Sequence, residues 1–142
     1  MHKIIITFAL VLLFSTLSSA QVYFGGGLRY NSNSDFSAIA PQVKLGVGLS
    51  DKVVINGNFA YYLGSKATWT TDLDLHYKLF NIADRFHIDP MAGITFTRTD
   101  ITNNSLTLGL SLKLLTDSYT YFLEPRYILD NNQTVFTLGV IF

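Results

Sequence analysis

The segment "YFLEPRYIL" (121–129) places a glutamate and an arginine in a run that is otherwise aromatic and aliphatic, apart from one proline. Side chains alternate between the two faces of a β-strand. The apolar members therefore share one face: Tyr121, Leu123, Pro125, Tyr127 and Leu129. Glu124 and Arg126 share the other. Because an isolated charge is costly to bury in an apolar medium, we expect these two to point into a polar protein interior while the apolar face meets an apolar exterior.

The same alternation recurs along the chain after residue 21, at intervals typical of strands joined by short turns. The segments between the repeats are rich in Asn, Asp, Ser and Gly, which favour turns. The pattern predicts eight strands, at 22–30, 39–49, 53–62, 68–80, 86–98, 105–115, 119–129 and 134–142. We therefore predict an all-β domain whose consecutive strands form antiparallel hairpins.

Each predicted strand has an apolar face and a polar face. The apolar faces carry Val43, Leu45, Val47 and Leu49; Trp69, Thr71, Leu73, Leu75, Tyr77 and Leu79; Leu106, Leu108, Leu110, Leu112 and Leu114. The polar faces carry charged and hydroxyl side chains beside many glycines: Gly25, Gly27, Gly46, Gly48, Gly93, Gly109 and Gly139. Glycine beside long polar side chains is expected where a narrow lumen must be filled.

Two architectures fit this pattern, and they differ in which face points inward. A soluble lipocalin-type barrel keeps the apolar face inside, whereas an outer-membrane barrel turns it outward to lipid. Aromatic residues gather at both ends of the strands, as interfacial girdles do: Tyr77, Phe86, Tyr119 and Phe142 at one rim, and Tyr30, Tyr61, Trp69, Phe96 and Tyr127 at the other. Together with the glycines, these girdles favour an eight-stranded antiparallel up-and-down transmembrane β-barrel.

The first twenty residues have the three-part pattern of a cleavable signal peptide. Lys3 is followed by the apolar run "IIITFALVLLF" (4–14) and by "SSA" (18–20). That run is shorter than the roughly 20 residues of a spanning helix. We predict cleavage after Ala20, which leaves residues 21–142 as one barrel domain without cysteine.

The signal peptide, the eight alternating strands and the closing "FTLGVIF" (136–142) resemble the small outer-membrane β-barrel domain family of Gram-negative bacteria, similar in plan to the transmembrane domain of outer membrane protein A. The resemblance implies location in the cell outer membrane, both termini in the periplasm, and contact with outer-membrane lipid and lipopolysaccharide. It also implies a C-terminal signal for the barrel-assembly machinery, at Phe136, Leu138, Val140 and Phe142. Acidic and basic residues balance at 10 each, so no basic face indicates nucleic acid.

Eight strands enclose a lumen that side chains just fill. We predict a structural charge network there, formed by Arg29, Lys44, Asp72, Asp74, His76, Lys78, His87, Asp89, Lys113, Glu124 and Arg126. Lys113 and Arg29 are the expected partners of Glu124, and Asp72 or Asp74 of Arg126. The predicted role is that of a small integral barrel with a filled lumen, structural or of unknown specific function. The alternatives are a narrow pore or a barrel that binds a small ligand or lipid.

Enzymatic and metal functions are less favoured. His76 and His87 are not in the His-x-Ser arrangement of the barrels that deacylate lipid A, so no catalytic residue is assigned. His76, His87 and Asp89, with Asp74 nearby, would ligate a metal only if the register brought them level. A neutral network of these side chains is the simpler interpretation, and no metal or cofactor is predicted.

Pro90 and Pro125 fall inside predicted strands. A closed barrel has no edge on which a missing N–H is harmless. We therefore expect each of the two prolines to lie at a bulge or near a rim.

Overall fold

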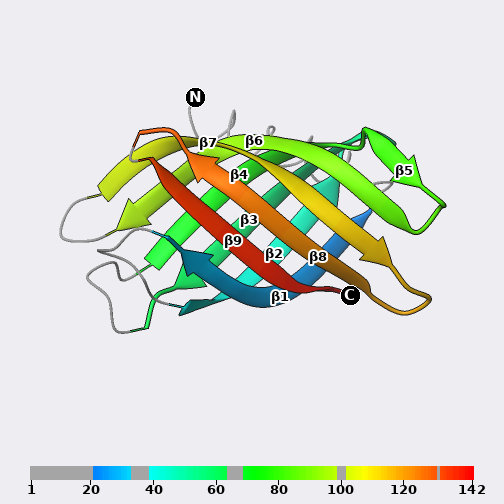
Figure 1. The fold of residues 1–142 in the computed structure, drawn as a ribbon, viewed down its shortest axis with the longest axis horizontal. Coiled ribbons are helices and arrows are strands. Elements are labelled where there is room, and N and C mark those ends of the chain that lie inside the picture. Colours follow the sequence, from blue (N-terminus) through cyan, green and yellow to red (C-terminus); the bar gives the residue numbers. More distant parts are fainter. Residues whose placement is uncertain (1–20, 33–38, 64–68, 99–101, 131) are drawn as a thin grey trace, which may run out of the picture.

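The computed structural model describes residues 21–32, 39–63, 69–98, 102–130 and 132–142, and these form an all-β structure (Figure 1). The predicted signal segment, residues 1–20, lies outside the described residues. No helix among the described residues is long and apolar enough to cross a membrane. The strands are β1 (Val22–Asn31), β2 (Ile39–Gly48), β3 (Val53–Tyr61), β4 (Trp69–Tyr77), β5 (Phe80–Ile82), β6 (Phe86–Arg98), β7 (Thr102–Leu115), β8 (Thr120–Ile128) and β9 (Gln133–Ile141).

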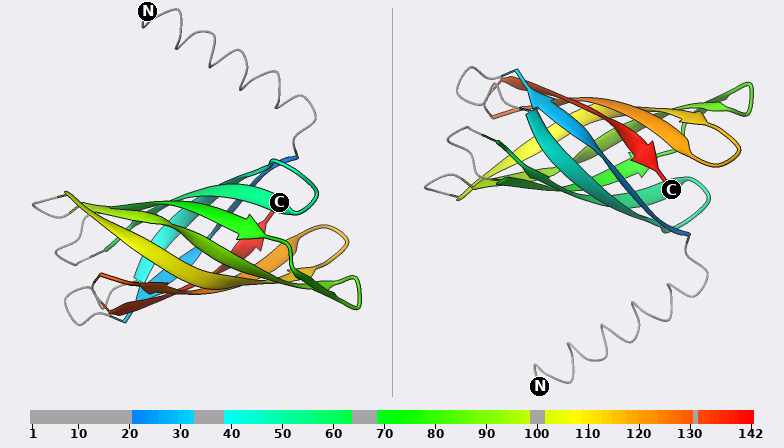
Figure 2. Two further views of the ribbon diagram at one scale, coloured as in Figure 1. Left: turned by 90° about the horizontal axis from the view of Figure 1, so that it is seen from above. Right: turned by 90° about the horizontal axis from the view of Figure 1, so that it is seen from below.

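The strands form one closed antiparallel barrel. Their order is β4-β3-β2-β1-β9-β8-β7-β6-β5, and a further pairing of β4 with β6 closes the sheet. The short β5 pairs only with β6 and continues the line of β4 toward the end of the barrel that also holds the C-terminus (Figures 1 and 2). We call each strand that runs the length of the barrel wall a stave, and β4 and β5 together form one stave. The barrel then has eight staves, which confirms the predicted eight-stranded up-and-down fold.

The break between β4 and β5 is a β-bulge. His76 of β4 faces Met91 of β6, and Phe80 of β5 faces Ile88. From His76 to Phe80 the chain advances four residues, whereas from Met91 to Ile88 the facing strand β6 spans only three. One extra residue is therefore inserted between β4 and β5. Pro90 lies opposite this insertion, where its missing N–H removes no regular ladder bond, and the expectation for Pro90 is confirmed.

Pro125 is different, and the expectation of a bulge or rim position is wrong for it. Pro125 lies inside β8 and pairs with Phe136 of β9 in an unbroken register. Toward β7 the register is the same on both sides of the proline, at Gly109 with Arg126 and at Leu112 with Leu123. In an antiparallel ladder the N–H and C=O of one residue point to the same neighbour. The missing N–H of Pro125 thus removes one hydrogen bond from the ladder between β8 and β7, and the register of these two strands stays the same.

The sequence predicts a turn over the whole segment "NIADR" (81–85), but Asn81 and Ile82 belong to β5, and the turn to β6 is therefore shorter than predicted. Ala83 and Asp84 both have positive φ, of 55° and 58°. Left-handed backbone costs an L-residue roughly 1–2 kcal/mol. An alanine in this conformation is therefore a local weak point in the barrel.

The distribution of polarity is the inverse of that in a soluble barrel. The exterior carries large exposed apolar side chains along every stave, with Phe24 63%, Val43 62% and Leu138 62% exposed. Inside, buried polar and charged residues outnumber buried apolar ones among the described residues. The predicted assignment of faces is confirmed, and an apolar-lined ligand cavity of lipocalin type is excluded.

Two inward aromatic rings explain two of the predicted lumen glycines. Tyr23 lies directly across from Gly46, and Phe122 directly across from Gly139. A Cβ added at either glycine would overlap the facing ring. Glycine is therefore required at these positions because the rings occupy the space where its side chain would lie.

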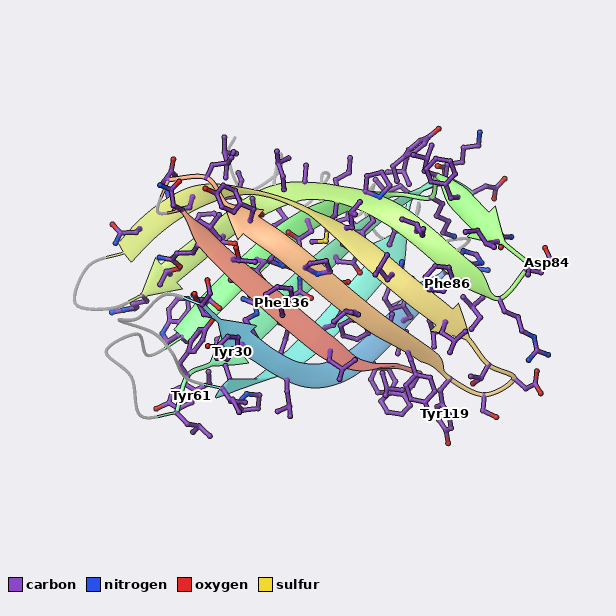
Figure 3. All side chains as sticks on the ribbon, viewed as in Figure 1. Tyr30, Tyr61, Asp84, Phe86, Tyr119 and Phe136 are labelled. Carbon is purple, nitrogen blue, oxygen red and sulfur yellow. The ribbon has the colours of Figure 1, made fainter. Side chains whose placement is uncertain are left out.

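Aromatic residues border both ends of the exterior apolar belt. Figure 3 shows Tyr30 and Tyr61 at one end of the barrel and Phe86 and Tyr119 at the other. The C-terminal residue Phe142 packs its ring against Phe24, with centroids 5.5 Å apart, and against Tyr119 at 5.6 Å. The two predicted girdles are present.

Candidate functional site: the charged lumen

Arg126 lies at the centre of the lumen and is 2% exposed. Its guanidinium is 2.9 Å from Asp72 Oδ2, 3.1 Å from Asp74 Oδ2 and 3.2 Å from Glu124 Oε2. One cation thus bridges three carboxylates from β4 and β8. A buried guanidinium is stable only when such partners replace its hydration.

Glu124 is fully buried and is shared between two cations. Lys44 Nζ of β2 donates to Glu124 Oε1 at 2.5 Å, and Ser111 Oγ donates to the same oxygen at 3.0 Å. Lys44 Nζ also lies 4.7 Å from the centre of the Phe122 ring. Glu124 is the carboxylate that links the two sides of the barrel through Lys44 and Arg126.

Arg29 completes the central network from β1. Its guanidinium pairs with Asp72 and donates to Gln42 Oε1 at 2.7 Å and to Thr70 Oγ1 at 2.9 Å. Asp72 also accepts from Thr95 Oγ1 at 2.8 Å. Every guanidinium and carboxylate of this network therefore has at least two partners.

The central network is neutral and reaches every stave. It contains three cations and three carboxylates: Arg29, Lys44, Arg126, Asp72, Asp74 and Glu124. Polar side chains of the remaining strands join it, including Asn58 of β3, Thr95 of β6, Ser111 of β7 and Thr137 of β9. A network with contacts on all sides crosses the lumen as a plug.

A second ion pair lies nearer the end of the barrel with the C-terminus. Lys113 Nζ of β7 is 2.8 Å from Asp89 Oδ2 of β6, and both side chains are buried. Lys78 and His87 are half-buried and line a cavity of about 350 Å³ at this end, together with Asp89 and Lys113. Apart from His76, which is buried but belongs to neither, the predicted lumen charges therefore form two separate groups.

The structure does not pair Glu124 with the partners expected from the sequence. Lys113 binds Asp89 and Arg29 binds Asp72, while Glu124 is held by Lys44 and Arg126. The expected partners of Glu124 are therefore wrong. Arg126 lies between Asp72 and Asp74, its two expected partners.

The register also separates the candidate metal ligands. His76 faces Met91, whereas His87 faces Asn81 beyond the bulge. Among the described residues, no group of three or more His, Cys, Asp or Glu side chains could hold a metal ion. Both ring nitrogens of buried His76 lack a hydrogen-bond partner within the same residues, so this imidazole is not part of a Ser-His-acid arrangement there.

Several lumen residues were missed at the sequence level. Tyr23 donates from its hydroxyl to Asn56, and Asn58 donates to Asp74 Oδ2 at 2.8 Å. The alternation in "VVINGNFAYY" (53–62) places both asparagines on the inward face of β3. Phe122 was missed because it is an apolar residue on a polar face, and the available signal was its alternation in step with Glu124 and Arg126 on that face.

No protein-family model matches the sequence, and no curated protein sequence matches it. Solved structures do match. The N-terminal β-barrel domain of Pseudomonas aeruginosa OprF is 18% identical, with a TM-score of 0.64 over 87% of this chain and 96% of that one. A de novo designed transmembrane β-barrel is 11% identical, with a TM-score of 0.65 over 85% and 92%. Outer membrane protein Ail of Yersinia pestis, in a phospholipid bilayer nanodisc, is 12% identical, with a TM-score of 0.52 over 86% and 99%.

At these identities the likeness concerns the fold and not an activity. The matched chains are transmembrane barrels, and nearly their whole length is covered. Their architecture agrees with the closed sheet, the apolar exterior and the polar lumen described above. The chain has the eight-stranded antiparallel fold of the small outer-membrane β-barrels.

Proposed function

We propose that this protein is a small integral barrel of the cell outer membrane with a structural role, whose lumen is closed by a neutral network of ion pairs. The observation that carries the proposal is the inverted polarity of the barrel. Apolar side chains such as Leu45, Leu108 and Leu138 are 55%, 52% and 62% exposed. In water such a surface would aggregate, whereas in lipid it is the stable arrangement.

Three further features support the outer membrane as the location. Aromatic girdles border the apolar belt, residues 1–20 have the pattern of a cleaved signal peptide, and an aromatic residue, Phe142, directly follows the last strand, β9. Outer-membrane lipid, lipopolysaccharide and, during biogenesis, the barrel-assembly machinery are the proposed partners. In the last interaction Phe136, Leu138, Val140 and Phe142 would be the recognised side chains, and all four point outward.

Cell fractionation tests the location. The full-length chain should be recovered in the outer-membrane fraction and released by detergent, and mass spectrometry should find Gln21 at its N-terminus. Recovery in the soluble periplasmic extract would contradict the membrane proposal. Recovery in the membrane with residues 1–20 still attached would contradict only the proposed cleavage.

The central network argues for a closed lumen. Arg126, Glu124 and Asp72 are each at most 2% exposed. The Arg126–Asp72 pair joins β8 to β4, and the Lys44–Glu124 pair joins β2 to β8, so the ion pairs cross the lumen. Eight-stranded barrels leave just enough interior room for side chains. The lumen therefore holds a plug of fixed charge, and no continuous water path is expected through it.

Planar-bilayer conductance separates the plugged lumen from the narrow pore. The purified wild-type barrel should give no steady single-channel steps. A double variant with Glu124→Ser and Arg126→Ser keeps polarity but removes side-chain volume at the centre of the plug, and it should acquire steps. Steady steps in the wild-type protein would favour the pore and refute the plug.

A further inference from the structure

The cavity at the C-terminal end of the barrel contains a lysine, Lys78, that has no ion-pair partner among the described residues, whereas every cation of the central network has one. Its volume of about 350 Å³ is at the lower end of the range for small-molecule sites, roughly 300–1,000 Å³. Its lining includes the charged or titratable residues Lys78, His87, Asp89 and Lys113. It also includes hydroxyl-bearing and aromatic residues: Thr116, Ser118, Tyr119, Thr120 and Phe142.

Lys78 and Lys113 line this cavity together with one buried carboxylate, Asp89, and with the C-terminal residue Phe142, whose α-carboxylate is a further negative charge. Asp89 binds Lys113 at 2.8 Å, and no ion pair joins Lys78 to another described residue. Asp117 also lines the cavity, but its side chain is 96% exposed and lies 3.9 Å from Arg85 on the outside. Lys78 is therefore a cation of this cavity without an ion-pair partner among the described residues, unlike the three cations of the central network.

Asp89 adds a second requirement. Asp89 is 1% exposed, and its Oδ1 atom has no hydrogen-bond partner within the described residues. Leaving a buried carboxylate oxygen without a donor is costly. A ligand that suits this cavity would thus carry an anionic group for the two lysines and a hydrogen-bond donor for Asp89.

We propose that this cavity binds a phosphate group that carries its own hydrogen-bond donor, with Lys78 and Lys113 pairing with the phosphate oxygens and Asp89 Oδ1 accepting from the donor. Two sources share this chemistry. Hydrogen phosphate supplies a P–OH, and the headgroup of an aminated phospholipid supplies an ammonium. Sulfate has the shape and charge but no donor, so the buried carboxylate discriminates against it. The proposal concerns the cavity itself and does not depend on the cellular location of the barrel.

The test is an NMR titration of the full barrel in a detergent without phosphate, such as octyl glucoside. The probes are inorganic phosphate, glycerophosphoethanolamine and sulfate, each added alone. We expect one of the two phosphates to shift the amides of Thr116, Ser118 and Thr120 with saturation, while residues at the far end of the barrel, such as Asn132, stay unchanged. The probe that saturates identifies the source, and sulfate should bind about tenfold more weakly or not at all.

Two variants and one matched control assign the effect to the cavity. Lys78→Gln should weaken phosphate binding by about tenfold, the change expected from losing one charge-assisted hydrogen bond. Lys52→Gln removes an equally charged side chain from the same end of the barrel, outside the cavity, and should leave binding unchanged. Asp89→Asn supplies an amide donor and should remove the preference for phosphate over sulfate.

Three results would overturn the proposal. The first is the absence of saturable shifts at the cavity with either phosphate. The second is equal weakening by Lys78→Gln and Lys52→Gln, which would indicate general screening. The third is equal affinity for sulfate and phosphate in the wild-type barrel, which would remove the role of Asp89.

Discussion

Replacing Glu124 by leucine tests the central network most directly, because this change leaves a specific cation without a carboxylate. Lys44 is 2% exposed, and Glu124 is its carboxylate partner, at 2.5 Å. Arg126 keeps Asp72 and Asp74 in the same variant. Breaking a buried pair by removing one member typically costs about 3–5 kcal/mol, and we expect Glu124→Leu to lower the free energy of unfolding by about that amount.

Replacing Lys44, the cation of the same pair, should lower the free energy of unfolding by less than replacing Glu124. In Lys44→Met, Glu124 keeps Arg126 at 3.2 Å and Ser111 at 3.0 Å, so the loss is about one charged hydrogen bond, roughly 1.5–3 kcal/mol. The double variant removes both members of the pair, and an apolar replacement of a whole buried pair is often neutral. Glu124→Leu with Lys44→Met should therefore be more stable than Glu124→Leu alone, by about 2 kcal/mol or more.

Urea unfolding in phospholipid vesicles measures these energies. Trp69, the one tryptophan of the chain, lies on the exterior of the barrel, and its fluorescence reports transfer to water. Lys113→Met is the matched control, since Lys113 pairs with Asp89 and should not rescue Glu124→Leu. Additive losses in the double variant, or rescue by Lys113→Met in place of Lys44→Met, would refute the assigned pairing.

Two further changes probe the exterior and a turn. Leu110 is 44% exposed on the outer face of β7, and Leu110→Arg should lower the stability of the barrel in vesicles by about 2–4 kcal/mol. Leu114→Arg, near the rim of the same strand, should lower it by about 0–1 kcal/mol. Urea unfolding measures both, and equal losses at the two depths would contradict a lipid-facing belt. Ala83 has a φ of 55°, so Ala83→Gly should raise the free energy of unfolding by about 1 kcal/mol. Ala92→Gly, in the extended β6, should lower it by about 0.5–1 kcal/mol. A loss of stability in both variants would show that the turn is not strained.

The faces of the barrel were predictable because the alternation of side chains is a local property of extended backbone. The run 121–129 alone indicates that Glu124 and Arg126 point away from the apolar exterior, and the structure places both in the lumen. The girdles and the strand number follow from the same pattern repeated along the chain. Pro90 indicated a bulge or a rim position, but which strand carries the extra residue was not predictable, because the insertion is visible only when β4 and β5 are aligned with β6.

The sequence by itself determined the closed all-β architecture and which charges lie inside it. Only the tertiary structure decided which charges meet. Lys44 and Glu124 are 80 residues apart and belong to strands that are not neighbours in the sheet. Their contact depends on the stagger of all staves around the closed barrel, and a shift of register in any one stave would change it. The same stagger leaves Lys78 beside Lys113 and Asp89 in one cavity, because registers between strands are set by the packing of the whole lumen and by no short segment of the chain.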